Sequence, residues 1–361
     1  MPSGRPARPG RGPPSSTGAR RRAPTASATG VRRRVRTSYS PLVGFRPTLG
    51  SARPIPTIGE QPVSAQSFEI RYVDVFAERP LLGNPVAVVL GAEGLDDATM
   101  QAIARWTNLS ETTFVLDSAV ADYRVRIFST VGEFPFAGHP TIGTAHAVRE
   151  VGLVAPGDGP AAATMECEAG LVPIVWNVDG TITATVPVSR MVGPGSGVTE
   201  LGDLLGGEVS EPVLVIDTGP HWMVAAMGSA AQVMAAEPDG DRLAAMCGAA
   251  KASGLTIYGF GPEGGGAVEV RSFAPGDGVP EDPVCGSGNA AVARHLEATG
   301  ALAGIGRSYT ARQGRAVGRD GRVAVQVSED GAEISIGGPA LTVVSGDLRL
   351  RTGGEKSEVV D

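Results

Sequence analysis

The sequence is poor in the residues that build disulfide frameworks and metal clusters. It contains three cysteines, Cys167, Cys247 and Cys285, which is an odd number, and they stand 80 and 38 positions apart. That spacing fits neither a disulfide framework nor a zinc site, so we expect a reducing, cytoplasmic setting. The four histidines are too few and too dispersed to suggest a metal cluster, and we expect no bound metal.

Long hydrophobic runs are also missing. No stretch approaches the roughly 18 apolar residues that a membrane-spanning helix needs, so we expect no membrane contact. The 361 residues are 42% hydrophobic and 19% charged, as is typical of a globular protein in water. Their number suits two domains of ordinary size with a substantial core.

Acidic residues are absent from the first 59 positions, which carry twelve arginines. The net charge of −7 is therefore the sum of this basic segment and the remaining body of the chain. The body has 19 basic and 38 acidic residues and would repel nucleic acid. We expect no nucleic-acid partner for this body. Residues 1–66 are rich in Pro, Gly, Ser and Arg without hydrophobic periodicity, and they predict a disordered extension. Three interpretations of it stay open: a transit peptide, an arm attracted to nucleic acid, or an extension outside the working protein.

From residue 67 the chain alternates predicted strands with short helices, which is typical of an α/β (α+β) protein. DDATMQAIARWTN has an aspartate cap at Asp96 and apolar residues at helical spacing, so it predicts a helix. The glycine-rich GFGPEGGG, from Gly259, lacks the context of a phosphate-binding loop and predicts a hairpin loop. Residues 352–361 predict a frayed tail.

This body consists of two similar halves, which we place at residues 67–190 and 191–334. Each has strands that lead to a sharp glycine-centred turn and then a helix of small residues. Residues 137–141 in the first half correspond to residues 285–289 in the second, which suggests an internal duplication. Two helix N-termini that are opened by glycine would face one cleft and together hold an anion, for which a small carboxylate is suited.

Three ionisable residues are candidates for chemistry. Glu111, in NLSETTF, lies among apolar neighbours whose packing would raise its pKa towards neutrality, as a proton shuttle requires; the alternative is a turn that caps its own backbone. His139 is predicted at a helix start, where the dipole favours its neutral form; the alternative is a polar cap. Asp282 precedes Pro283, which keeps it extended. It would orient His139, share a proton with it, act as a second acid/base, or serve only the turn.

The neighbours of Asp282 are open to more than one interpretation. We expect Glu281 to face solvent. Ser287 lies between two glycines without a Gly-x-Ser-x-Gly elbow, so anion binding is favoured over a hydrolase nucleophile. Cys285 is either a thiol acidified by the helix N-terminus or a small residue packed under the turn. The other histidines, His146, His221 and His295, are predicted to be structural.

Four segments, in this order, together resemble the phenazine-biosynthesis isomerase (PhzF-like) family. They are VDVFAERPLLGNPVAVV, NLSETTFV, FPFAGHPTIGTAHAV and RSFAPGDGVPEDPVCGSGNAAV, and the resemblance covers roughly residues 67–350. It implies a diaminopimelate-epimerase-like fold of two pseudo-symmetric halves, each a curved, mostly antiparallel sheet around a central helix, with the active site between them. It also implies that a C-terminal strand near residues 335–350 returns to the first half, and that the protein forms a homodimer.

The resemblance also implies roles for individual residues. Glu111 matches the family's proton-transferring glutamate, and His139 and Asp282 match the polar pair around the reacting ring. Gly138 and Ser287 match groups that bind the substrate carboxylate, and we add Gly286 to this anion site. The prototype isomerises a dihydro-hydroxyanthranilate without a cofactor, so none is expected here.

The same fold serves epimerases that use two cysteines, and these supply an alternative. Cys285 stands where such an enzyme has one of its cysteines, whereas many PhzF-like relatives carry threonine there. The other cysteine position is Ala137, which cannot transfer a proton. We therefore expect a biosynthetic, cofactor-independent isomerase that acts on a small carboxylate, with Cys285 as a possible accessory. A Cys285-dependent epimerase or racemase and a non-catalytic metabolite-binding protein are the alternatives.

Overall fold

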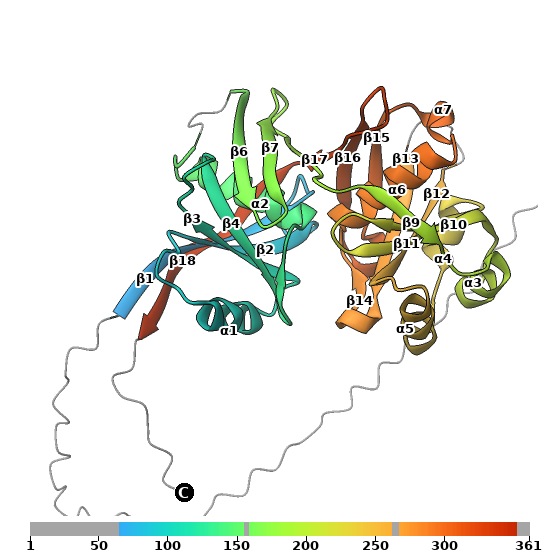
Figure 1. The fold of residues 1–361 in the computed structure, drawn as a ribbon, viewed down its shortest axis with the longest axis horizontal. Coiled ribbons are helices and arrows are strands. Elements are labelled where there is room, and N and C mark those ends of the chain that lie inside the picture. The colour runs from blue at the N-terminus through green and yellow to red at the C-terminus, as the bar shows by residue number, and fades with distance from the viewer. Residues whose placement is uncertain (1–64, 155–158, 262–266, 352–361) are drawn as a thin grey trace, which may run out of the picture. The chain divides into compact units, whose positions relative to one another are not determined.

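The computed structural model describes residues 65–154, 159–261 and 267–351 (Figure 1). The predicted extension (apart from its last two residues), the tip of the Gly259 loop and the predicted tail lie outside these residues. The first strand begins at Ala65, slightly before the predicted boundary at residue 67. Along the described residues, no helix combines the length and the hydrophobicity needed to cross a membrane.

The first half of the fold is a sheet wrapped around one helix. The helix is α2 (Gly138–Glu150), and it packs against strands β1, β2, β3 and β8. A second helix, α1 (Asp97–Thr107), covers the outer face of β3 and β4. The strands of this half are β1 (Ala65–Val75), β2 (Asn84–Leu90), β3 (Glu111–Leu116), β4 (Tyr123–Ser129), β5 (Glu133–Phe134), β6 (Ala161–Cys167), β7 (Gly170–Trp176) and β8 (Ile182–Thr185).

The second half repeats this plan around helix α6 (Gly286–Ala298), which packs against β10, β11, β12 and β16. Its strands are β9 (Arg190–Pro194), β10 (Val209–Asp217), β11 (His221–Met227), β12 (Gly254–Phe260), β13 (Ala267–Ala274), β14 (Val279–Asp282), β15 (Ser308–Gln313) and β16 (Gly321–Val327). The other helices are α3 (Val198–Leu205), α4 (Ala230–Ala235), α5 (Gly240–Ala249) and α7 (Leu302–Ile305), with single 3₁₀ turns at Pro275–Asp277 and Arg315–Val317.

Both central helices are buried on nearly every side, which small side chains make possible. Alanine, glycine, serine and threonine make up half of the residues of α2 and α6, so the surrounding strands approach closely. Most strand pairs are antiparallel, and the parallel ones are β2–β3, β4–β6, β11–β12 and β13–β15. The architecture is therefore the predicted one, with two similar halves that each wrap a helix.

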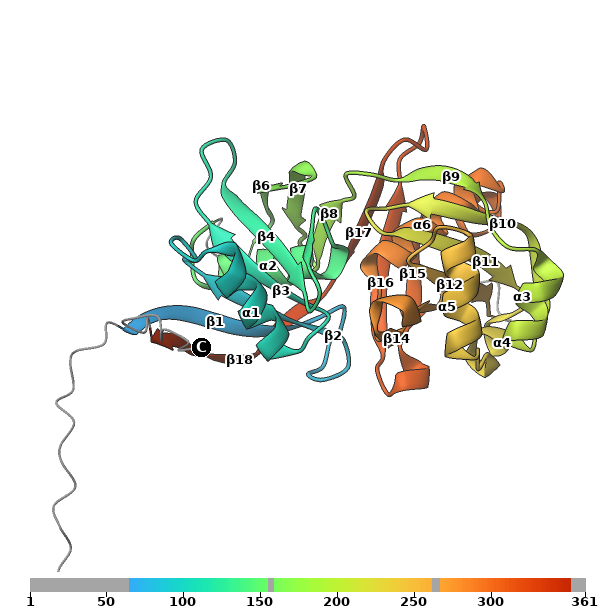
Figure 2. The same ribbon diagram turned by 60° about the horizontal axis from the view of Figure 1, so that its bottom comes forward.

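Two C-terminal strands connect the halves. β17 (Ile334–Gly338) pairs with β16 of the second half along one edge and with β8 of the first half along the other. β18 (Ala340–Arg351) then runs antiparallel to β1 along its whole length, which Figure 2 shows at the edge of the first half. The described strands consequently form one continuous sheet.

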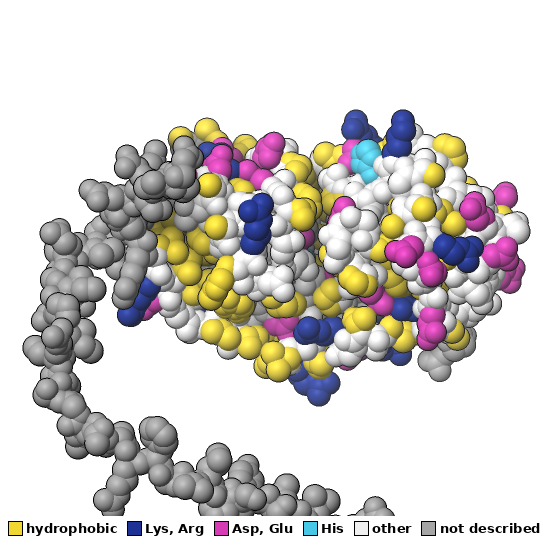
Figure 3. Space-filling view, turned by 90° about the horizontal axis from the view of Figure 1, so that it is seen from below, with side chains coloured by type: hydrophobic (Ala, Val, Ile, Leu, Met, Phe, Trp, Pro, Cys, Tyr) yellow, Lys and Arg dark blue, Asp and Glu magenta, His cyan; other side chains and the backbone are white. Residues whose placement is uncertain are grey.

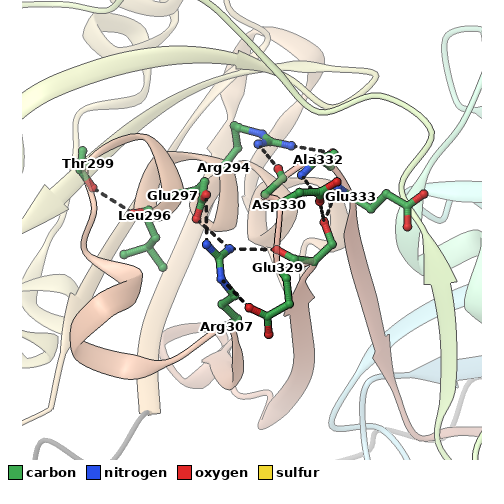
Figure 4. A network of polar contacts seen from close by, with 11 residues as sticks. Arg294, Leu296, Glu297, Thr299, Arg307, Glu329, Asp330, Ala332 and Glu333 are labelled. Carbon is green, nitrogen blue, oxygen red and sulfur yellow. Dashed lines mark hydrogen bonds and ion pairs between the residues drawn. The ribbon is translucent and has the colours of Figure 1, made fainter.

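A network of arginine contacts fixes the far end of α6 (Figure 4). Arg294 donates to the carbonyl oxygens of Gly331 (2.6 Å) and Ala332 (3.1 Å) in the turn between β16 and β17. Arg307 pairs with Glu297 of α6 at 3.1 Å. These contacts hold the C-terminal part of α6 against the segments that follow it in the chain.

Candidate active site

The N-termini of α2 and α6 lie against each other at two glycines. A Cβ added to Gly286 would lie 3.0 Å from the backbone nitrogen of His139 and 3.1 Å from the Cα of Gly138. A Cβ added to Gly138 would meet the Ile336 side chain at 2.5 Å. Any larger residue would push the helices apart, so the predicted glycine turns bring two positive helix ends to one place.

Backbone N–H groups at these helix ends are available to a ligand. Ala137 precedes α2 and supplies no side-chain cap. Cys285 precedes α6; its Sγ accepts from the N–H of Gly288, at 3.2 Å, and lies 3.5 Å from Ser287 Oγ. The first N–H groups of a helix have no acceptor within the helix itself, which makes such paired ends suitable for an anion.

A cleft of about 650 Å³ opens over these helix ends and is lined by residues of both halves. Figure 3 shows the molecule from the side on which α1 and β14 lie in Figure 1. The lining includes all seven residues that were predicted for the site: Glu111, Gly138, His139, Asp282, Cys285, Gly286 and Ser287. No lysine or arginine is among its described lining residues, so backbone dipoles must balance a bound anion.

Glu111 and His139 face each other in this cleft. Glu111 Oε2 lies 3.4 Å from His139 Nε2, and their side chains are only 14% and 5% exposed. Neither atom has a hydrogen-bond partner within the described residues. Burial, and then the charge of Asp282, raise the pKa of Glu111 to about 8, while burial lowers the pKa of His139 to about 3. Near neutral pH, therefore, Glu111 is mostly protonated and His139 is uncharged.

Asp282 supplies the negative charge of the site. Its Oδ1 accepts hydrogen bonds from the backbone N–H of Val284 and from the side-chain amide of Asn84, both at 3.0 Å. Burial raises the pKa of Asp282 to about 6, although hydrogen bonds from Cys285 and Val284 act in the opposite direction. Near neutral pH the cleft thus combines an acidic proton on Glu111 with a carboxylate on Asp282.

Asn84 is a member of this arrangement that the sequence did not indicate. It is fully buried, and its amide nitrogen lies 3.0 Å from Asp282 Oδ1 and 3.3 Å from Nδ1 of His139. Asp282 therefore does not contact His139 through a hydrogen bond of its own, because Asn84 lies between them. The only signal in the sequence was the polar residue in the Gly-Asn-Pro turn before β2.

Cys285 is packed beneath the turn. It is 3% exposed, and burial, followed by the charge of Asp282, raises its pKa well above the ordinary value for a thiol. Burial and the charge of Asp282 therefore disfavour the alternative in which the helix N-terminus acidifies this thiol. Ser287 is also buried, and its Oγ accepts from the indole N–H of Trp222 at 3.0 Å, which leaves the hydroxyl hydrogen for another acceptor.

Glu281 does not face solvent, contrary to the prediction. Its carboxylate accepts two hydrogen bonds from Arg271, at 2.9 Å and 2.7 Å, and both side chains are at most 10% exposed. Arg271 comes from the neighbouring strand β13, and strand register is not visible in the local sequence. The ion pair holds the end of β14 and hence the segment that carries Asp282.

Comparison with known proteins identifies the family. Residues 73–346 match the family described as Phenazine biosynthesis-like protein. The chain is 38% identical to antisense-enhancing sequence 1 of Schizosaccharomyces pombe over 294 residues, which are 76% of this chain and 97% of the relative. It is 34% identical to the trans-2,3-dihydro-3-hydroxyanthranilate isomerase of Pseudomonas aeruginosa, over 73% of this chain and 93% of the relative.

A solved structure agrees with these relatives. The phenazine biosynthesis protein of the PhzF family from Bacillus anthracis superposes with a TM-score of 0.67 and 25% identity, over 78% of this chain and 99% of the other. The fold, the cleft between the halves and the named relatives define the class of the protein, an isomerase with an epimerase-like fold. Within that class, the chain belongs to the PhzF-like family.

Within the described residues, no group of three or more His, Cys, Asp or Glu side chains is arranged to hold a metal ion. The ionisable side chains of the cleft are instead close enough to exchange protons with one bound molecule. The arrangement is suited to acid–base chemistry on a ligand whose negative end lies at the helix N-termini.

Proposed function

We propose that this isomerase moves a proton from one carbon to another within a small, carboxylate-bearing metabolite of a biosynthetic pathway. The carboxylate binds at the paired ends of α2 and α6, against the N–H groups near Gly138 and Gly286 and the hydroxyl of Ser287. Glu111 transfers the proton. His139 and Asp282 polarise and orient the reacting part of the molecule.

One observation carries this proposal: Glu111 Oε2 and His139 Nε2 are buried 3.4 Å apart, without partners in the described part of the chain, beside the helix ends. Leaving two polar atoms unpaired in a protein interior costs free energy, so their persistence is typical of a site that a ligand completes. A pKa near neutrality makes both protonation states of Glu111 accessible.

The proposed reaction balances without another reactant. As the ligand's C–H bond breaks, the Glu111 carboxylate gains the proton and the electron pair moves into the conjugated system of the ligand. The new O–H bond then breaks, and the same proton is delivered to a different carbon. Glu111 ends in the state in which it began, and the dipoles of two helices stabilise the carboxylate end throughout.

A Cys285-dependent epimerase is less well supported. Such an enzyme needs a thiolate, and burial holds the Cys285 thiol in its neutral form. The corresponding position in the first half is Ala137, which has no proton to exchange. A protein that only binds its metabolite also has no need of a carboxyl group with a pKa near neutrality, such as that of Glu111.

The test uses trans-2,3-dihydro-3-hydroxyanthranilate, the compound in the name of the Pseudomonas relative. The full chain is incubated with it in deuterium oxide, and conversion and deuterium content are followed by proton NMR and mass spectrometry. We expect isomerisation that Glu111→Gln abolishes, whereas Glu168→Gln, which changes an exposed glutamate in the turn between β6 and β7, serves as the matched control.

The outcomes separate the alternatives. Undiminished turnover in Glu111→Gln contradicts the assigned proton transfer. Deuterium exchange that is lost in Cys285→Ser but retained in Glu111→Gln supports the epimerase instead. If this substrate is not converted at all, a panel of cyclic and amino-substituted carboxylates is tested under the same conditions.

A further inference from the structure

The Gly-Asn-Pro turn before β2 places an amide at the boundary of the two halves. Asn84 belongs to the first half but donates to Asp282 and to the backbone carbonyl oxygen of Val284, both at 3.0 Å, in the second. Its side chain also lies 3.3 Å from Nδ1 of His139. A fully buried amide therefore touches both groups of the predicted polar pair, which come from different halves.

The turn itself is rigidly held. Asp74 of β1 accepts hydrogen bonds from the backbone N–H groups of Leu82 (3.0 Å) and Gly83 (3.1 Å). A Cβ at Gly83 would lie 2.2 Å from the carbonyl oxygen of Val75, so only glycine fits there. These contacts fix the start of β2 and leave Asn84 little freedom to move away from the cleft.

A count of hydrogens assigns the donors. An amide nitrogen carries two hydrogens, and that of Asn84 is surrounded by three polar atoms: Asp282 Oδ1, the carbonyl oxygen of Val284 and His139 Nδ1. The two shorter contacts lead to Asp282 and Val284, so the hydrogens are committed to the second half. His139 then keeps its own proton on Nδ1, near the carbonyl oxygen of Pro85, and directs the lone pair of Nε2 at Glu111.

We propose that Asn84 is a positioning residue for the proton transfer: it holds the Asp282 carboxylate beside His139 so that both face the same bound molecule. This inference rests on the proposed function of Glu111, His139 and Asp282. Without the amide, Asp282 is held by one fewer donor and the carbonyl group of Val284 loses a partner, so the carboxylate can turn away from the imidazole.

The amide also affects the charge of Asp282. A donor to the ionised form of a carboxyl group favours ionisation, so the amide of Asn84 should act in the same direction as the donors Cys285 and Val284. Removing Asn84 should therefore raise the midpoint at which Asp282 takes up a proton by about one pH unit or more. Because burial also sets this midpoint, a loss of packing alone would admit water and lower it, which is the opposite direction.

The experiment compares Asn84→Ala with the wild-type chain. Asn177→Ala is the matched control, because the Asn177 amide also donates two hydrogen bonds, to Thr181 and Thr183, in the turn between β7 and β8. The carboxyl carbon of Asp282 is followed by carbon-13 NMR across the pH range, and turnover of trans-2,3-dihydro-3-hydroxyanthranilate is measured in parallel. We expect a raised midpoint and a loss in kcat of about 10²-fold with little change in KM in Asn84→Ala alone.

A second variant covers the case in which Asn84→Ala does not fold. Asn84→Leu keeps a side chain of similar shape but has no hydrogen to donate and adds no charge, so loss of the amide alone should raise the Asp282 midpoint. An unchanged midpoint in a folded variant overturns the inference, as does an equal loss of kcat in Asn177→Ala. The NMR titration needs no substrate, so it remains decisive even if the proposed reaction fails.

Discussion

Gly138 and Gly286, the first residues of α2 and α6, are separated by less space than one methyl group requires. A Cβ on Gly286 would lie 3.1 Å from the Cα of Gly138 and 3.0 Å from the nitrogen of His139. The obstacle is backbone, which cannot rotate away as a side chain can. The distance between the two positive helix ends therefore depends on glycine at these two positions.

Gly286→Ala should separate the helix ends and weaken the anion site. We expect kcat/KM to fall by about 10-fold, because these contacts require a shift that is smaller than the displacement of about 1 Å that costs about 10²-fold. Kinetics on trans-2,3-dihydro-3-hydroxyanthranilate test this. Gly248→Ala in α5, where a Cβ would meet nothing within 4 Å, should leave turnover unchanged. Equal activity in all three proteins would show that the close approach is unnecessary.

The helix starts could be predicted because their signals are local. Gly138 with Pro140 marks the beginning of α2, and the side chain of Asp96 caps α1 by accepting from the N–H of Thr99 at 2.8 Å, as expected. The repetition of the glycine turn in both halves also indicated that the two helix ends meet. The helix starts need only a few consecutive residues, and the repeat needs only a comparison of two such short segments.

The contacts of the candidate site could not be predicted in the same way. Asn84 and Asp282 are 198 positions apart, so no pattern in the sequence shows that their side chains touch. The partner of Glu281 depends on the pairing of β13 with β14, which decides that Arg271 is within reach. For Cys285 the sequence indicated a position at a helix N-terminus, where the dipole would lower the pKa of the thiol. The extent of burial, which raises that pKa, depends on the whole fold.

Glu111→Gln should make the protein more stable at alkaline pH while it removes turnover. The folded state raises the pKa of Glu111 from 4.5 to about 8, so between these values it holds a proton that the unfolded chain has released. The free energy of unfolding contributed by Glu111 therefore falls as the pH rises from about 4.5 to about 8. Glutamine carries no such proton and avoids this loss.

Urea unfolding at several pH values measures this effect. The difference between Glu111→Gln and wild type should be small near pH 4.5 and grow to a few kcal/mol at about pH 8, since one unit of pKa corresponds to about 1.4 kcal/mol. Asp282 titrates in both proteins, so its contribution largely cancels. A difference that does not vary with pH would contradict the raised pKa of Glu111.

All three thiols should be unreactive in the folded protein. Burial raises the pKa of Cys167 and of Cys285, and it raises that of Cys247 to about 11. Because the thiolate is the reactive form, a disulfide reagent near pH 8 should label the native chain slowly and label all three cysteines after urea is added. Cys285→Ser should keep most of the turnover. Rapid labelling of native Cys285 with loss of activity would instead favour a catalytic thiol.

Arg271→Met should destabilise the protein strongly, because it leaves the buried Glu281 carboxylate without its partner. The expected loss in the free energy of unfolding is about 3–5 kcal/mol. Arg349→Met provides the control, since Arg349 pairs with Asp347 at 3.3 Å on the surface and such exposed pairs contribute about 0–1 kcal/mol. Restoring stability by Glu281→Met in the Arg271→Met background would identify the unpaired charge, rather than lost packing, as the cause.

The pH dependence of kcat/KM should identify the protonation state in which Glu111 begins. Proton abstraction requires the carboxylate, and burial together with Asp282 raises the pKa of Glu111 to about 8. The rate should therefore increase as the pH rises and level off above about 8, since kcat/KM reports the ionisation of the free enzyme. The increase of kcat/KM with pH should be absent from any slow reaction that remains in Glu111→Gln and present in Glu168→Gln. A rate that decreases above about pH 8 would mean that the reaction starts when the acid form of Glu111 protonates the ligand. That form is lost above the pKa of Glu111, and the carboxylate has no proton to give.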